Sequence, residues 1–194
     1  MKRFMFSVLA ALLLSVSVPM LSADDEESPA KSEDKPATLE DCGKAVGGIW
    51  IGEEGIKDPK APHGRFISEW GVGEKVCRSR TYWVQDGKET QIYEGAQYWH
   101  PKRKELVFFE VSFQGELYEG TIVKRGEDSV SKWTAYSDKG EVEYEQRGSY
   151  IDDDTMTSSV YYRKDGEWVL MRTYKFHRKP LDWKGDEPEK KDEE

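Results

Sequence analysis

The stretch GGIWIGEEG, residues 47–55, follows a polar, proline-containing run and precedes the first extended segments of the chain. It places Trp50 between glycines, and Trp50 is the first large aromatic residue of this part of the sequence. Glycines in a strand allow sharp coiling and the close approach of other backbone segments. From the segments that follow, and from a resemblance described below, we expect Trp50 to lie on the first strand of a closed antiparallel barrel.

The residues after this stretch show almost no helical pattern. Instead, segments of period-two alternation recur, rich in Tyr, Trp, Val, Ile and Thr, with Gly- and Asp-containing turns between them. The ten expected strands cover residues 48–54, 64–72, 75–85, 90–99, 105–113, 116–124, 129–136, 142–151, 155–163 and 167–177. Only residues 55–63, which contain two prolines, are expected to form a longer loop.

Ten strands joined by tight hairpins form a meander, and a meander of this length removes its exposed edges by closing on itself. The sequence therefore predicts an all-β fold, a single up-and-down antiparallel β-barrel of about ten strands over residues 39–180. We expect one apolar inward stripe, formed by Val107, Phe109, Val111 and Phe113. A second inward stripe has mixed polarity, with Val142, Tyr144, Gln146, Gly148 and Tyr150. Mixed polarity favours a partly polar cavity over a solid apolar core.

The two ends of the chain differ in composition from the barrel segment. Lys2 and Arg3 precede an apolar run that ends in Leu21-Ser22-Ala23, which is typical of a secretory signal peptide over residues 1–23. The alternative is an uncleaved membrane anchor. Residues 24–38 and 181–194 are acidic and contain proline, so we expect a disordered linker and a disordered tail. These features predict a periplasmic or secreted protein without stable membrane insertion after cleavage.

The charge of the chain limits its partners. Removing the two basic residues of the signal peptide from a total of 29 leaves 27 basic against 38 acidic residues, a formal charge of −11. Non-specific nucleic-acid binding requires a basic surface that displaces counterions. We therefore expect no nucleic-acid partner.

Two cysteines, Cys42 and Cys77, lie in the exported segment. An even number of cysteines in an oxidising compartment favours one disulfide bond between them. The alternative is a pair of buried free thiols. Neither cysteine lies beside a general base in the sequence, so a catalytic thiol is not expected.

The triplet Gly48-Ile49-Trp50 resembles the Gly-x-Trp signature that begins the first strand of lipocalins and other calycins. The run from Trp50 to Gly55 resembles the start of nitrobindin-type ten-stranded barrels. Residues 39–180, which end in YKFHRK at 174–179, resemble uncharacterised secreted bacterial proteins with a calycin-like barrel. The resemblance implies that Trp50 plugs the closed end. Since the last of ten meandering strands ends beside the start of the first, we expect Arg178 to lie over the Trp50 indole.

The last strand carries an anomalous cation. The side chains that share one of its faces by period two are Trp168, Leu170, Arg172, Tyr174 and Phe176. A guanidinium on an aromatic interior face needs a partner, because an unpaired buried charge costs several kcal/mol. Arg172-Thr173-Tyr174 resembles the Arg-x-Tyr pair with which fatty-acid-binding calycins hold a ligand carboxylate. The alternative partner is a protein carboxylate, and the candidates are Glu69, Glu94, Glu110 and Glu119.

Other chemistry is not favoured by the sequence. His63, His100 and His177 are isolated from one another, and no nucleophile or acid–base pair is evident, so we do not expect an enzyme. Asp152 to Asp154 lack the spacing of a calcium loop and are interpreted as a solvated turn, so no metal is expected. Nitrobindins hold haem through a histidine of the last strand, but residues 169–173 read VLMRT, which disfavours haem.

Two functions remain open from the sequence. One is an exported carrier that binds a small amphiphilic, anionic ligand, with Arg172, Tyr174 and Tyr144 as candidate ligand-binding residues. The other is a ligand-free barrel that acts as a protein-interaction or envelope structural module with an unknown partner. An unpaired Arg172 on an aromatic interior wall favours the carrier.

Overall fold

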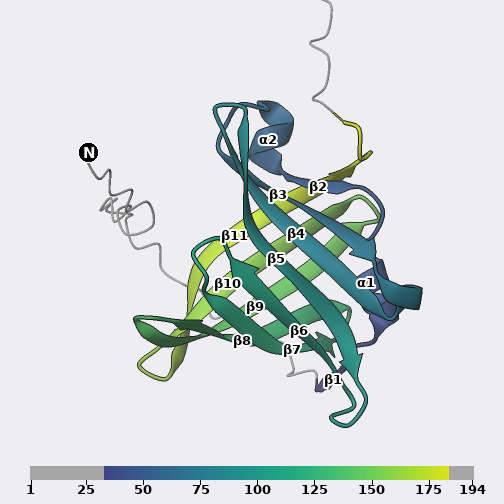
Figure 1. Cartoon of the computed structure of the whole chain (residues 1–194), viewed down its shortest axis with the longest axis vertical. Helices are drawn as coiled ribbons and strands as arrows, with labels where there is room; N and C mark the ends of the chain where they lie inside the picture. The colour runs from purple at the N-terminus through teal and green to yellow at the C-terminus, as the bar shows by residue number, and fades with distance from the viewer. Residues whose placement is uncertain (1–32, 184–194) are drawn as a thin grey trace, which may run out of the picture. The chain divides into compact units, whose positions relative to one another are not determined.

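The computed structural model describes residues 33–183 of the chain as a closed antiparallel barrel of ten strands, with one short strand added outside it (Figure 1). The barrel strands are β2 (Ile49–Gly52), β3 (His63–Trp70), β4 (Val76–Gln85), β5 (Lys88–His100), β6 (Glu105–Ser112), β7 (Leu117–Arg125), β8 (Asp128–Ser137), β9 (Gly140–Asp152), β10 (Thr155–Lys164) and β11 (Glu167–Lys179). The all-β barrel fold predicted from the sequence is confirmed.

Each barrel strand pairs with the next strand along the chain, and β11 pairs with β2 to close the barrel. The closing seam joins Phe176 to Gly52 and Lys179 to Ile49. Its four residue pairs make it shorter than the hairpin ladders, such as the ten pairs between β10 and β11. No helix within residues 33–183 has the length and apolar character needed to cross a membrane.

Strand β1 (Asp34–Pro36) corrects one expectation, because these residues were assigned to the disordered linker. It pairs with the end of β7, where Lys35 lies opposite Lys124. The guanidinium of Arg125 donates to Asp34 at 2.8 Å, and the Lys132 ammonium lies 3.0 Å from the same carboxylate. An acidic residue that reads as solvated in the sequence is therefore held by two cations of the barrel wall. Residues 1–32 and 184–194, with the predicted signal peptide and most of the tail, lie outside the described residues.

Two short helices and a 3-10 turn, η1 (Val72–Glu74), were not predicted from the sequence. Helix α1 (Leu39–Gly43) packs against β4 and β5 and brings Cys42 into the apolar cluster at one end of the barrel. Its first turn is capped, since the Asp41 carboxylate accepts a hydrogen bond from the Thr38 backbone N–H at 2.8 Å. Helix α2 (Glu53–Lys57) follows β2 directly and contacts β11 and β3 at the other end. Helices of five residues are too short to produce a helical period in the sequence.

The strand register shows which side chains point into the barrel, because directly paired residues share a face and alternate residues point to opposite sides. Trp50 is fully buried and stacks on Phe66, and tracing pairs from Phe66 around the wall places Phe108 and Glu110 of β6 inside. The predicted inward stripe of Val107, Phe109, Val111 and Phe113 is therefore wrong, since these side chains face outwards. Both faces of β6 carry large apolar residues, so alternation alone could not distinguish them. The mixed stripe of β9 does face inwards.

Candidate functional site

The closed end of the barrel is built around Trp50 and Arg178. The Arg178 guanidinium carbon lies 4.6 Å from the centroid of the Trp50 ring, in the contact expected from the strand count. Trp50 Nε1 donates to the carbonyl of Ala45 at 3.0 Å, and the guanidinium donates to the carbonyls of Lys44 and Val46. The indole is thus packed and hydrogen-bonded to the segment that leads into β2, which gives this pair a structural role.

The two cysteines lie in the apolar cluster at this end, and both are free thiols in the structure. The predicted bond between Cys42 and Cys77 is therefore not formed, and the alternative of two buried thiols describes the structure. Burial raises the pKa of Cys42 to about 12, and the nearby Cys77 adds to that effect. Burial also raises the pKa of Cys77. Both groups are accordingly neutral thiols, unsuited to nucleophilic chemistry at neutral pH.

Arg172 lies on the interior face of β11, opposite Val160 of β10. Its guanidinium carbon stands 5.1 Å from the centroid of the Tyr174 ring, and its side chain is exposed. Between Val160 and Tyr161 the register with β11 shifts by one residue, which makes a bulge at Met171. The bulge reverses the alternation, so Trp168 and Leu170 do not share the face of Arg172 and Tyr174. The prediction that five side chains of this strand share one face is therefore wrong for Trp168 and Leu170.

None of the four candidate carboxylates pairs with Arg172 in residues 33–183. Glu69 forms an ion pair with Arg80, and Glu94 accepts a hydrogen bond from Gln91. Glu119 lies on the outer face of β7. Glu110 points inwards but accepts its hydrogen bond from Ser79. The guanidinium of Arg172 is therefore held by an aromatic ring and has no carboxylate partner among the described residues.

A polar and aromatic group on the opposite wall was not recognised from the sequence. Tyr93 and Tyr118 pack edge to face, with ring centroids 5.4 Å apart. The Tyr118 hydroxyl donates to the Glu116 carboxylate at 2.6 Å, and the Glu116 backbone follows the hairpin turn after β6. Burial raises the pKa of both tyrosines. Tyr174 faces the same lumen from β11, which is not a neighbour of β5 in the sheet.

Glu110 reaches Ser79 because the residue between them has no side chain. A Cβ on Gly95 would lie 2.5 Å from Glu110 Cγ and 2.1 Å from the carbonyl oxygen of Phe109. The Ser79 hydroxyl is 3.3 Å from the Glu110 carboxylate. Burial raises the pKa of Glu110, and the hydrogen bond from Ser79 opposes that shift only in part. Two features of the sequence could have identified this site: a glycine inside a strand, Gly95, and a single acidic residue, Glu110, within the otherwise apolar strand that follows it.

The interior differs along its length in how tightly it is filled. Large side chains of the closed end, including Trp50 and Leu106, are fully buried. In the open half, Tyr144 stacks on Trp133 at 5.5 Å between centroids, and both remain partly exposed. Solvent therefore reaches the lumen side of these two rings, and Arg172 and Tyr174 face the same lumen from β11.

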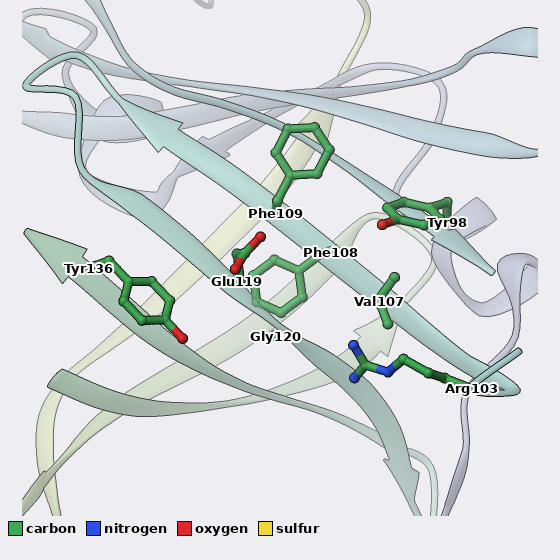
Figure 2. Close-up of a pocket in the computed structure, with 8 residues that line it drawn as sticks. All are labelled: Tyr98, Arg103, Val107, Phe108, Phe109, Glu119, Gly120 and Tyr136. Carbon is green, nitrogen blue, oxygen red and sulfur yellow. The ribbon is translucent and has the colours of Figure 1, made fainter. Parts of the chain in front are cut away.

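A second candidate surface lies outside the barrel. A groove of about 270 Å³ crosses the outer face of β5 to β8 (Figure 2). Its outward-facing side chains are Tyr98, Arg103, Val107, Phe109, Glu119 and Tyr136. The exposed fraction of Phe109 is 39% and that of Phe113, further along the same stripe, is 68%. This stripe is the one that the sequence had placed inside the barrel.

The three histidines of the chain do not form a haem or metal site. His63 is buried on the outer side of β3, with Nδ1 2.7 Å from the carbonyl of Ala61. His100 accepts a hydrogen bond from the Arg103 backbone N–H, and His177 alternates with the inward-facing Phe176. Residues 33–183 contain no cluster of three or more metal-ligating side chains. Because no histidine faces the lumen, the residues present do not fit a haem held through a histidine of the last strand.

Comparison with known proteins does not show a family for this chain. No protein-family model matches it, and no curated protein matches it. Among solved structures, the crystal structure of Rv2717c from M. tuberculosis aligns with a TM-score of 0.44 at 13% sequence identity. The alignment covers 75% of this chain and 99% of that chain. We draw no functional argument from a likeness of this size.

Proposed function

We propose that the chain is an exported, calycin-like binding protein, not an enzyme, which holds a small amphiphilic ligand with an anionic group in the open half of the barrel. Export rests on the apolar N-terminal residues, which lie outside the described part. The ligand proposal rests on one observation. Arg172 stands on the interior face over Tyr174 and has no carboxylate partner in residues 33–183.

The surroundings of Arg172 support an amphiphile. A guanidinium can hold a carboxylate through two parallel hydrogen bonds, and the rings of Tyr174 and Tyr144 provide apolar surface for a chain or ring. Tyr174 continues into the aromatic wall, because it stacks on Phe176 with centroids 5.9 Å apart. An acid whose apolar part lies along this wall would place its head group at Arg172.

The proposal is tested by titrating the delipidated full-length chain with fluorescent fatty acids. Replacing Arg172 by Met keeps much of the side-chain volume and removes the charge. We expect Arg172→Met to weaken binding of acids by about 1.5–3 kcal/mol, the range for hydrogen bonds to charged groups. Binding of uncharged analogues should be retained.

The matched control is Arg163→Met. Arg163 also stands over an aromatic ring, 5.4 Å from the Trp168 centroid, but on the outer face of the barrel. Its replacement should leave acid binding unchanged. If the wild-type chain shows no saturable binding of any acid, the carrier proposal is wrong.

The outer groove favours a second candidate function, a barrel that serves as a protein-interaction module. Its apolar side chains, including Phe109 and Tyr136, are exposed beside the charged groups of Arg103 and Glu119. A photoreactive residue at position 113 in the native host tests this candidate. A discrete cross-linked partner that is lost in Phe109→Glu would support it, and cross-links that do not change with Phe109→Glu would count against it.

A further inference from the structure

Two carboxylates lie on the wall of the open half that is across the barrel from β11 and Arg172. They are Glu110 of β6 and Glu116 of the turn before β7, and neither forms an ion pair within residues 33–183. A ligand that brought only negative charge would place a second anion near these carboxylates. A ligand that also carries a cation would complement both walls.

Glu110 has one hydrogen-bond partner among residues 33–183. Its carboxylate is largely buried within the wall, and the Ser79 hydroxyl donates to it at 3.3 Å. Gly95 has no side chain, and this allows the Glu110 side chain to lie across its backbone. Glu116, by comparison, already accepts hydrogen bonds from the Tyr118 hydroxyl at 2.6 Å and the Ser112 hydroxyl at 3.4 Å.

Aromatic rings surround the acidic wall. Tyr118 lies between the two carboxylates, because it is paired with Glu110 in the β6–β7 ladder and its hydroxyl donates to Glu116. Tyr93 packs edge to face against Tyr118, and Tyr174 faces the same lumen from the strand of Arg172. Tyrosine faces attract ammonium groups, and the attraction increases when the cation is desolvated. Carboxylates with aromatic rings between them are a suitable environment for an organic ammonium, whereas a metal ion would require more oxygen ligands.

We propose that this acidic and aromatic wall is a subsite for a protonated amine, so that the ligand of the barrel is amphoteric, with its acid at Arg172 and its amine at Glu110. The inference rests on the proposed function, because it assigns the second end of the same ligand. It adds a specificity that Arg172 alone does not provide, namely selection against simple fatty acids.

The proposal has a consequence for proton binding. The groups that face Glu110 are Ser79 on β4, Tyr93 on β5, Tyr118 on β7 and Glu116 in the turn before it, and none of them is a cation. Burial without a cation raises the pKa of Glu110, and an arriving ammonium should lower it. Calorimetric titrations at several pH values, in buffers of different ionisation enthalpy, would measure the protons released on binding.

The direct test compares dodecanoic acid with its ω-hydroxy and ω-amino derivatives, together with shorter and longer ω-amino acids, on the full-length chain. We expect the best ω-amino acid to bind at least about tenfold more tightly than the plain acid of equal length. Glu110→Gln and Glu116→Gln should each reduce this preference. Glu69→Gln, on the outer face and paired with Arg80, is the matched control and should keep it.

The outcomes separate this inference from the proposed function. Saturable binding of plain acids with no gain from the amine would overturn the amine subsite and leave the carrier standing. A hydroxy acid that binds as tightly as the amino acid would also overturn it, because a neutral hydrogen-bonding group would then be sufficient. If none of the acids binds saturably, both proposals fail. The comparison of ligands on the wild-type chain holds even if a Gln variant does not fold.

Discussion

The two ends of the barrel use the same side-chain types in opposite ways. At the closed end, the Trp50 indole is fully buried, its N–H is satisfied by Ala45, and Arg178 covers its face. In the open half, Arg172 stands over Tyr174 in a similar geometry, yet it is exposed and lacks a carboxylate partner in the part of the chain that the structure describes. The difference teaches that an arginine over an aromatic ring is structural where backbone carbonyls and a carboxylate also hold it, as Lys44, Val46 and Asp154 hold Arg178. At Arg172 those partners are replaced by the ligand that we propose.

The largest expected effect tests the closed end. Trp50→Ala should lower the free energy of unfolding by about 3–5 kcal/mol, the range for truncating a buried tryptophan. Trp133→Ala, which removes a partly exposed tryptophan from the open half, should cost clearly less. Urea unfolding followed by circular dichroism measures both. Equal losses would mean that the two ends are packed alike and that the contrast between them is wrong.

A smaller effect is expected at the glycine that lets Glu110 cross the wall. Gly95→Ala would push a methyl group into the Phe109 carbonyl, and overpacking of this kind costs about 1–3 kcal/mol. Gly148, also inward-facing, is the control, because a Cβ there would approach no atom more closely than 3.8 Å. Differential scanning calorimetry of the two variants separates them. A Gly148→Ala variant as unstable as Gly95→Ala would show that crowding is not the cause.

The smallest effect is expected at Glu110, whose contribution to the free energy of unfolding should depend on pH. The pKa of Glu110 is raised above its ordinary value of 4.5, so the folded chain keeps this proton to higher pH than the unfolded chain. The stability that the wild type gains from this proton is complete below pH 4.5 and is lost as the pH rises through the raised pKa.

Glu110→Gln should therefore match the wild type in acid and exceed it at neutral pH, by about 1.4 kcal/mol for each unit by which the pKa is raised. Unfolding free energies of both proteins measured across this pH range provide the check. A difference that stays constant with pH would contradict the assignment of a buried acid.

Much of the fold could be predicted from the sequence, because strand length, turn chemistry and period two are local properties. The ten expected segments correspond to the ten barrel strands, and the count of ten was sufficient to bring Arg178 to Trp50. The face of β6 could not be predicted, since Leu106 and Phe108 on one side compete with Val107 and Phe109 on the other. The bulge at Met171 leaves no mark in the alternation of the residues before it.

The candidate site was predictable only where a residue contradicted its surroundings. Arg172 was identified because a guanidinium is unexpected among aromatic residues. Glu110 entered only as one of four partners for Arg172, and Tyr93 and Tyr118 read as ordinary strand residues. Their association depends on pairs between β4, β5, β6 and β7, and such distances are set by the closed sheet.

The seam between β2 and β11 has a consequence for how the chain is made. Its two strands are the first and last of the barrel, so the pairing of Ile49 with Lys179 requires nearly the whole domain to have been synthesised. During translation the hairpins can form in order, but β2 and β11 each keep an unpaired edge until the end. Contacts between residues so distant in sequence slow folding. The chain therefore passes through a stage at which an open, edge-exposing sheet is its most structured form, and at that stage a chaperone would protect it from aggregation.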